Sequence, residues 1–176
     1  MAPFEARRVR VVGNSGAGKT TFARALAARL GVPHLELDAV FWDTGWVKRD
    51  VDEARALIDG FLAGADAGWV ADGNWSVLGD ALDSVEAYVW LDYPRRVVMP
   101  RVVRRSVSRR LRRTELWHGN REDFWSLFSR DPHRNVVAWS WTAHDASRER
   151  YAALAETASV VRLRSPRQAR RWLAEL

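Results

Sequence analysis

One short segment near the N-terminus has the residue types and spacing needed to hold a phosphate chain. Gly13, Gly18, Lys19 and Thr20 occupy the fixed positions of the pattern G-x-x-x-x-G-K-T. The glycines allow backbone angles that let successive N–H groups turn towards an anion. Lys19 adds a positive charge, and Thr20 offers a hydroxyl group to Mg²⁺. A Gly-rich turn without a ligand is the alternative, but the pattern favours a nucleoside triphosphate site. The residues assigned to it are Gly13, Asn14, Ser15, Gly16, Ala17, Gly18, Lys19, Thr20 and Thr21.

Two carboxylates follow short predicted strands and could serve phosphoryl transfer. Asp72 follows Trp69–Ala71 and could hold Mg²⁺ through water, since Mg²⁺ keeps most of its hydration. Asp38 follows the stretch 34–37 and could accept a proton from the hydroxyl group of a second molecule. A turn residue at 72 and a helix cap at 38 are the structural alternatives. We predict a metal role for Asp72 and a catalytic, acceptor-binding role for Asp38.

An arginine-rich segment lies in the second half of the chain. Residues 95–113 contain nine arginines and no acidic residue. At helical spacing Arg101, Arg105 and Arg109 share one face, from which they could neutralise charge on a transferred phosphoryl group and exclude water. A solvated helix face is the alternative. The histidines lack the spacing of metal ligands, and no role is predicted for His34, His118, His133 and His144.

Aromatic residues gather in two regions. The segment 39–46 has no clear period, and Trp42 and Trp46, together with Trp75, could stack on a planar ring or pack in the core. The aromatic residues nearer the C-terminus are predicted to pack between helices. These are Phe124, Trp125, Phe128, Trp139 and Trp141.

Alternating strands and helices are predicted to position these residues. Strands are expected over 9–12, 34–37, 69–71, 85–91 and 160–163. A helix follows the phosphate segment and ends before Gly31. Others begin after Asp50, cross the arginine run, span 116–131 and 133–155, and follow the capping box at Ser165. Strands separated by helices predict a parallel sheet that is covered on both faces and binds ligands at its carboxyl edge.

Composition limits the possible classes of protein. The 176 residues are 47% hydrophobic and 28% charged, with no membrane-length apolar run and no secretory leader, which predicts one soluble, cytoplasmic domain without a membrane partner. The absence of cysteine excludes disulfides and thiolate metal sites. The net charge of +6 is concentrated in the arginine run, so a nucleic-acid partner is not expected.

The motifs together resemble the small P-loop kinases related to adenylate kinase, above all the adenylate kinase-like proteins labelled DNA topology modulation proteins. The resemblance spans almost the whole chain. Its motifs are Gly13–Thr21, Leu37-Asp38 with Trp42 and Thr44-Gly45-Trp46, Trp69–Trp75, Trp90–Arg95 and Leu163-Arg164-Ser165. Departures from the family pattern are Ala17, Thr44, Trp75 and the segment 113–120.

The resemblance implies an α/β, three-layer P-loop fold with a five-stranded parallel sheet of the nucleoside-monophosphate-kinase type and a helical, arginine-rich lid. It also implies phosphates and Mg²⁺ at Lys19 and Thr20, with Asp72 near the metal. The chain is expected to be a single domain, 1–176, with a lid over about 104–135. By the family's late loop, the backbone around Ser165 is expected to contact adenine.

These observations predict an ATP- and Mg²⁺-dependent phosphotransferase, monomeric or homodimeric, that acts on a small acceptor. The acceptor is expected to be a nucleotide or nucleoside. Lys19, Asp38, Asp72, Arg101, Arg105 and Arg109 are the predicted catalytic residues, Thr20 and Asp72 the metal residues, and Asp38, Trp42, Trp46, Asn74 and Trp75 the acceptor residues. A nucleotide-gated nucleic-acid-binding protein and a regulatory ATPase are the alternative functions.

Overall fold

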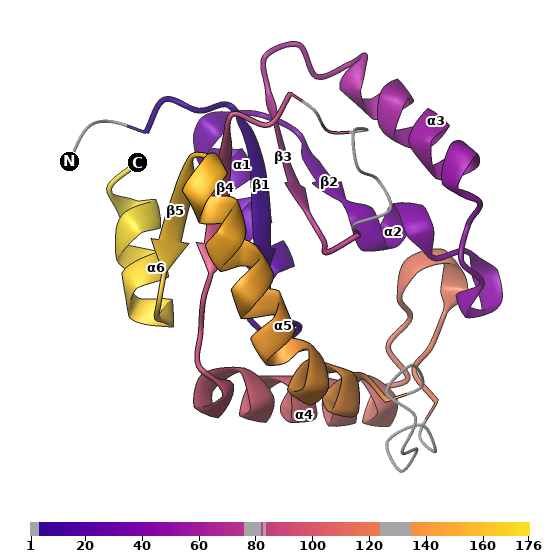
Figure 1. Cartoon of the computed structure of the whole chain (residues 1–176). Helices are drawn as coiled ribbons and strands as arrows, with labels where there is room; N and C mark the ends of the chain where they lie inside the picture. The colour runs from indigo at the N-terminus through magenta and orange to yellow at the C-terminus, as the bar shows by residue number, and fades with distance from the viewer. Residues whose placement is uncertain (1–3, 76–81, 83, 124–134) are drawn as a thin grey trace.

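The computed structural model describes residues 4–75, 82, 84–123 and 135–176. Strands and helices alternate along most of the chain (Figure 1). In order they are β1 (Arg8–Gly13), α1 (Lys19–Leu30), β2 (His34–Glu36), α2 (Leu37–Phe41), the 3₁₀ turn η1 (Thr44–Trp46), α3 (Val51–Leu62), β3 (Trp69–Asp72), β4 (Ala87–Leu91), α4 (Arg95–Leu111), the 3₁₀ turn η3 (Trp117–Gly119), α5 (Val136–Thr157), β5 (Val160–Leu163) and α6 (Pro166–Ala174).

The five strands form one parallel sheet in the order β2-β3-β1-β4-β5, which confirms the predicted fold class. Successive residues of β1 point to opposite faces of the sheet. Val11 belongs to a core shared with Leu26 of α1, whereas Val12 packs with Trp90 of β4 and Tyr151 of α5. Figure 1 shows α5 crossing in front of the sheet. The sheet is therefore the middle layer of three.

Several helix boundaries follow the predicted capping residues. The Asp50 side chain accepts hydrogen bonds from the backbone N–H groups of residues 52 and 53 at the start of α3. Ser165 caps α6 by accepting from Gln168 N at 3.2 Å. Gly31 ends α1 in the left-handed conformation, with φ 64°. These helix ends therefore coincide with short-range capping signals in the sequence.

The region after α4 differs from the prediction. The helix expected over 116–131 is wrong in its described part, where Trp117–Gly119 forms a 3₁₀ turn and Glu115 pairs with Arg121 in an antiparallel bridge. His118 has φ 55°, which an α-helix cannot accommodate. Residues 124–131, with Phe124, Trp125 and Phe128, lie outside the described residues. The predicted lid over 104–135 likewise stays a prediction.

Two tryptophans of α5 lie on the surface, against expectation. Trp139 is 46% exposed and Trp141 is 54% exposed. The residues that α5 buries are Ser140, His144 and Tyr151. Because neighbouring helical positions point about 100° apart, burying Ser140 turns both tryptophans away from the sheet. The prediction that they pack between helices is therefore wrong.

Helix α4 contains Pro100 beyond its first turn, where the proline cannot donate the hydrogen bond that would reach the carbonyl of residue 96. Its buried residues include Val98 and Val102, which join the core beneath the phosphate segment. Among the helices of the described residues, none is both long and apolar enough to cross a membrane.

Candidate active site

The segment from Gly13 to Lys19 forms a tight loop between β1 and α1, and its glycines have distinct roles. Gly13 and Gly16 have φ 144° and 85°, and an added Cβ would meet Leu91 O at 2.7 Å at position 13 and would clash with Val102 Cγ2 at position 16. These contacts pack the loop against β4 and α4. Gly18 precedes α1 with φ 91° and faces open space. The free N–H groups at the start of α1 therefore lie at this loop, where they can bind an anion.

Lys19 lies at the first position of α1, and its Nζ is 3.4 Å from the carbonyl oxygen of Asn14. Burial lowers the pKa of its ammonium group below the ordinary value of 10.5, an effect that Asp38 and Asp72 oppose and Arg105 reinforces. Burial thus disfavours the charged form of Lys19, and a bound anion would stabilise that charge.

Thr20 and Asp72 are joined directly. Thr20 Oγ1 donates to Asp72 Oδ2 at 2.7 Å, and Glu36 Oε1 lies 3.4 Å from the same hydroxyl. Asp72 is 2% exposed, and its Oδ1 accepts from His34 Nε2 at 2.7 Å. Glu36 and His34 were missed from sequence, although the pairing of β2 with β3 brings Glu36 beside Asp72. His34 thus fixes the orientation of the Asp72 carboxylate.

The donor set around Thr20 fits Mg²⁺. A hydroxyl and two carboxylates supply the oxygen ligands that Mg²⁺ prefers, and Mg²⁺ completes its shell with water and phosphate oxygens. Within the described ranges no group of three or more His, Cys, Asp or Glu side chains could hold a metal ion by itself. The protein therefore offers a partial ligand set of the kind that works together with a bound triphosphate.

Asp38 lies in the first turn of α2, not at the end of a strand, because β2 stops at Glu36. Trp75 Nε1 donates to Asp38 Oδ1 at 2.6 Å. The Trp75 ring stacks on Phe41, with ring centroids 4.3 Å apart and planes at 10°. The stacking contact with Phe41 fixes the indole ring of Trp75. The hydrogen bond from this ring then fixes one oxygen of the Asp38 carboxylate.

The three predicted arginines of α4 line one cleft, but their contacts differ. Arg105 Nη2 donates to Ser15 Oγ at 3.1 Å, and its Nε is buried without a hydrogen-bond partner among the described residues. Arg109 pairs with Glu122 at 3.0 Å. The Arg101 guanidinium lies 5.8 Å from the centroid of the Tyr93 ring. Arg105 is therefore the arginine placed directly at the phosphate loop.

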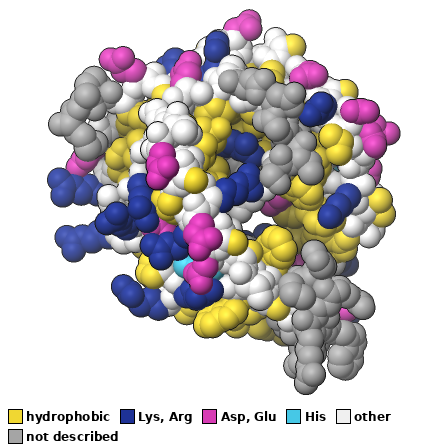
Figure 2. Space-filling model, in the orientation of Figure 1, with side chains coloured by type: hydrophobic (Ala, Val, Ile, Leu, Met, Phe, Trp, Pro, Cys, Tyr) yellow, Lys and Arg dark blue, Asp and Glu magenta, His cyan; other side chains and the backbone are white. Residues whose placement is uncertain are grey.

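The predicted site residues meet in a cleft of about 1570 Å³. Figure 2 shows a hollow on this face of the molecule, edged by Lys or Arg side chains and by hydrophobic side chains. This volume exceeds the usual range of about 300–1,000 Å³ for a single drug-sized ligand. The cleft therefore has room for a nucleotide and a second molecule. Its lining includes Ser15, Gly16, Gly18, Lys19, Thr20, Thr21, Asp38, Trp42, Trp46, Asn74, Trp75, Arg101, Arg105 and Arg109.

The remaining predicted residues lie outside that lining. Gly13, Asn14 and Ala17 form the buried side of the loop, and Asp72 lies beneath Thr20. Ser165 caps α6. The predicted adenine contact around Ser165 stays a prediction.

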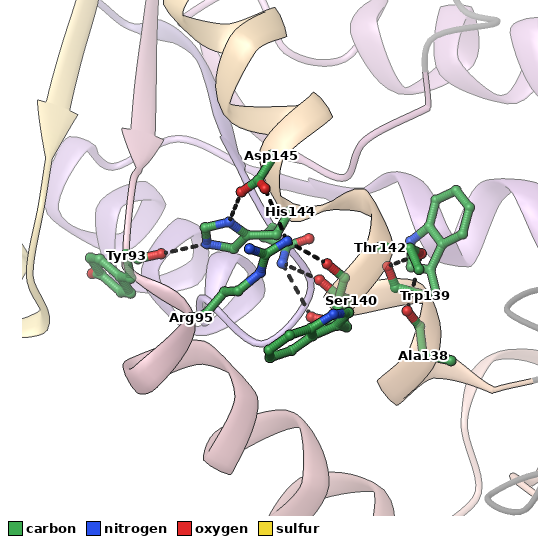
Figure 3. A network of polar contacts seen from close by, with 10 residues as sticks. Tyr93, Arg95, Ala138, Trp139, Ser140, Thr142, His144 and Asp145 are labelled. Atoms are coloured by element: carbon green, nitrogen blue, oxygen red, sulfur yellow. Dashed lines mark hydrogen bonds and ion pairs between the residues drawn. The ribbon is translucent and has the colours of Figure 1, made fainter.

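Helix α5 holds the phosphate loop from the far side. Asn14 Nδ2 donates to the Ser140 carbonyl oxygen at 2.8 Å, and Ser140 Oγ donates to Ser15 O at 3.0 Å. One turn on, His144 lies between Tyr93 O and Asp145 Oδ1, each 3.1 Å away (Figure 3). These bonds join α5 to the loop and to the end of β4. No sequence motif marked Ser140.

Asn74 has a similar supporting position. Its Nδ2 donates to Gly13 O at 2.8 Å, and its Oδ1 accepts from the Tyr151 hydroxyl at 2.9 Å. Both polar atoms of the amide are therefore used to tie the loop to α5. The amide keeps a second N–H and a second lone pair, so the predicted contact of Asn74 with the acceptor stays a prediction.

No family model matches the chain. The uncharacterized protein YqaC from Bacillus subtilis (strain 168) is 30% identical over 105 residues, and the match covers 58% of this chain and 58% of that relative's length.

Solved structures show a clearer likeness. Shikimate kinase from Acinetobacter baumannii, in complex with shikimate, superposes with a TM-score of 0.59 at 18% identity, over 97% of this chain and 90% of the other. An unliganded sugar kinase from Janibacter sp. HTCC2649 superposes with a TM-score of 0.52 at 21% identity, over 96% of this chain and 93% of the other. Shikimate kinase from Bacteroides thetaiotaomicron superposes with a TM-score of 0.53 at 14% identity, over 96% of this chain and 94% of the other. The chain therefore has the fold of small P-loop kinases, with its sheet in the order 2-3-1-4-5.

Proposed function

We propose that the protein is an ATP- and Mg²⁺-dependent phosphotransferase that transfers the γ-phosphoryl group to a hydroxyl group of a small acceptor, a nucleotide or nucleoside. The observation that carries this proposal is that Lys19 and Asp38 line the same cleft, which has room for two ligands. A protein that only bound or hydrolysed a nucleotide would need neither the second half of the cleft nor a carboxylate oriented within it.

The nucleotide half is supplied by the loop, Lys19, Thr20 and Arg105. The N–H groups of the loop and the two cations would neutralise the phosphates, and the unpartnered Nε of Arg105 would gain a hydrogen bond from an anion. Thr20, with Asp72 and Glu36, would hold Mg²⁺. This ion would neutralise part of the charge on the phosphates.

The acceptor half is organised by Asp38. Its Oδ1 already accepts from Trp75, so Oδ2 is the oxygen left to take the proton of an acceptor hydroxyl. As that proton moves to Asp38, the acceptor oxygen bonds to the γ-phosphorus and the bond from phosphorus to the bridging oxygen breaks, releasing ADP. The hydrogen bond from Trp75 holds the carboxylate in this orientation.

The comparisons support a kinase with a small hydroxylated acceptor. The neighbouring structures are named as shikimate kinases and a sugar kinase, and one of them contains shikimate. The sequence motifs point more narrowly to the adenylate kinase-like proteins. That narrower relationship, and with it a nucleotide or nucleoside as acceptor, forms part of the proposal.

The test is acceptor-stimulated ADP release by purified protein across nucleotides, nucleosides and sugars, repeated with Lys19→Ala. We expect turnover of the variant to fall by about a hundredfold or more, because one lost preorganised contact to the transition state costs about 3 kcal/mol. Arg29→Ala, an exposed cation in the last turn of the same helix, is the matched control and should retain activity. Unchanged turnover in Lys19→Ala would refute the function, and stimulation by no acceptor would favour a regulatory ATPase.

A further inference from the structure

Ser15 lies where the phosphate loop meets two helices. Its carbonyl oxygen accepts a hydrogen bond from Ser140 Oγ of α5 at 3.0 Å, and its own Oγ accepts one from Arg105 Nη2 of α4 at 3.1 Å. Ser140 is fully buried and is held in turn by Asn14, whose Nδ2 donates to the Ser140 carbonyl oxygen at 2.8 Å. The backbone of Ser15 is therefore fixed by α5, and its hydroxyl group is bound to α4.

The guanidinium group of Arg105 has few other partners. Within the described part of the chain it forms no ion pair, and its Nε is buried without a hydrogen bond. By contrast, its neighbours Arg109 and Arg110 both pair with Glu122, at 3.0 and 2.6 Å. Among the described residues, the Ser15 hydroxyl is therefore the polar group that fixes the direction of the Arg105 guanidinium.

This guanidinium lies close to the two groups between which a phosphoryl group would move. Burial and the charge of Arg109 lower the pKa of Arg105, and the carboxylates of Glu122 and Asp38 oppose this effect. Burial also lowers the pKa of Lys19, with Asp38 opposing the effect and Arg105 reinforcing it. Lys19, Asp38 and Arg105 all line the same cleft. In the proposed reaction the γ-phosphoryl group leaves the loop at Lys19 for a hydroxyl group at Asp38, so it passes within reach of Arg105.

The position of α4 does not depend on the bond between Ser15 and Arg105. Gly16 packs directly on α4, where an added Cβ would clash with Val102 Cγ2 and would lie 3.0 Å from the carbonyl oxygen of Val98. Both valines are fully buried. Removing the Ser15 hydroxyl would therefore leave α4 on the loop and release only the guanidinium group.

From these contacts we infer that Ser15 is a positioning residue, whose hydroxyl holds Arg105 towards the γ-phosphoryl group of the bound nucleotide. A hydrogen bond from a guanidinium to a phosphate oxygen is charge-assisted and strong, and it weakens steeply when the donor points away. Ser15 thereby favours binding of a nucleoside triphosphate over the diphosphate. The inference rests on the proposed phosphotransferase function and adds to it the residue that orients the arginine.

The test compares two nucleotides by calorimetry in the presence of Mg²⁺: ADP, and an ATP analogue with a non-hydrolysable β,γ bridge. In Ser15→Ala we expect the Kd for the analogue to rise by about tenfold, because Arg105 is no longer held towards the third phosphate. The Kd for ADP should change by less than about twofold. An equal loss for both nucleotides, or no loss for the analogue, would overturn the inference.

Ser106→Ala is the matched control. Ser106 neighbours Arg105 on α4, is fully buried, and has a hydroxyl group without a hydrogen-bond partner among the described residues. Its removal changes a serine of the same helix without touching the contact between Ser15 and Arg105. This variant should bind both nucleotides like the parent protein.

A double-mutant cycle separates positioning from direct contact. If Ser15 acts through Arg105, then Ser15→Ala should change the Kd for the analogue by less than about twofold in a protein that already carries Arg105→Ala. Fully additive losses would show that Ser15 contributes independently of Arg105, and would overturn the positioning role.

The proposed function and this inference can fail separately. The binding measurements need no acceptor, so a lack of phosphate transfer to every acceptor tried would refute the kinase function and leave the link between Ser15, Arg105 and the third phosphate in place. Where an acceptor is phosphorylated, Ser15→Ala should lower kcat by about tenfold and leave the KM for the acceptor within about twofold of the parent value. An unchanged kcat would keep the kinase and overturn this inference.

Discussion

Asp72 connects three elements through its two carboxylate oxygens. It ends β3, accepts from Thr20 of α1 through Oδ2, and from His34 of β2 through Oδ1. Because a carboxylate only accepts hydrogen bonds, His34 Nε2 carries the proton. Both oxygens are thus oriented before any metal arrives. The position of Asp72 could be predicted from the apolar strand that precedes it, whereas its histidine partner could not.

Asp72→Asn keeps the shape of the side chain and removes its charge. If Asp72 holds the water shell of Mg²⁺, half-maximal activity should need about 10- to 100-fold more Mg²⁺, as for other outer-shell ligands. Nucleotide binding without Mg²⁺ should be preserved. Activity measured against Mg²⁺ concentration checks this, with Asp66→Asn, an exposed carboxylate before the same strand, as control. An unchanged Mg²⁺ dependence would remove Asp72 from the metal site.

Nucleotide affinity should depend on pH through Lys19. Since burial lowers the pKa of its ammonium group, the free protein loses this charge before pH 10.5 is reached. Affinity should therefore be full below the lowered pKa and fall as pH rises through it. Bound phosphate raises the pKa again, so binding in that window takes up a proton. Calorimetry in buffers of different ionisation enthalpy measures the uptake.

Lys19→Arg keeps a charge that does not titrate in the same range. Its nucleotide affinity should show no such fall and no such uptake. A parallel decline in both proteins would assign the pH dependence to another group.

At the level of elements, the local sequence predicted the strands and helix ends correctly. It did not predict segments whose conformation depends on contacts with distant residues. The five strands, the caps at Asp50 and Ser165, and the end of α1 at Gly31 follow from local chemistry. The helix expected over 116–131 is wrong in its described part, where His118 has a positive φ that its own side chain disfavours. Contacts with residues 39–46 stabilise that region, among them His118 Nε2 at 2.9 Å from Ala39 O.

The packing of α4 against the phosphate loop gives a prediction at this scale. An alanine Cβ at position 16 would clash with Val102 Cγ2 and would lie 3.0 Å from the carbonyl oxygen of Val98. Gly31 also has positive φ but faces open space, so Gly31→Ala carries the backbone strain alone. Gly16→Ala should therefore lower the free energy of unfolding by about 1–3 kcal/mol more than Gly31→Ala. Urea unfolding of both variants measures the difference, and equal values would mean that the loop does not pack on α4.

At the scale of the molecule, the cleft has two halves. The sequence pattern predicts the nucleotide half, but it does not predict the acceptor half. The phosphate loop, Asp72 and the helix from which Arg105 projects follow from motifs and from the carboxyl edge of a parallel sheet. The acceptor half depends on residues 43–46 meeting residues 120–121, a pairing without any local sequence signal. Trp117, which lines the cleft, therefore entered the site only through the structure.

Asn120 is the residue through which this pairing can be tested. The residue is 4% exposed, and its side chain forms hydrogen bonds with both Asp43 O and Trp46 N. Asn120→Ala removes both bonds, at a cost of about 1–3 kcal/mol for the buried groups left unpaired. Because these bonds shape only the acceptor half, the KM for the acceptor should rise by about tenfold, while the Kd for the nucleotide stays unchanged. Steady-state kinetics and nucleotide titration measure the two constants, with Thr114→Ala at an exposed neighbouring position as control. An equal loss for both ligands would show that the two halves of the cleft are shaped together, not independently.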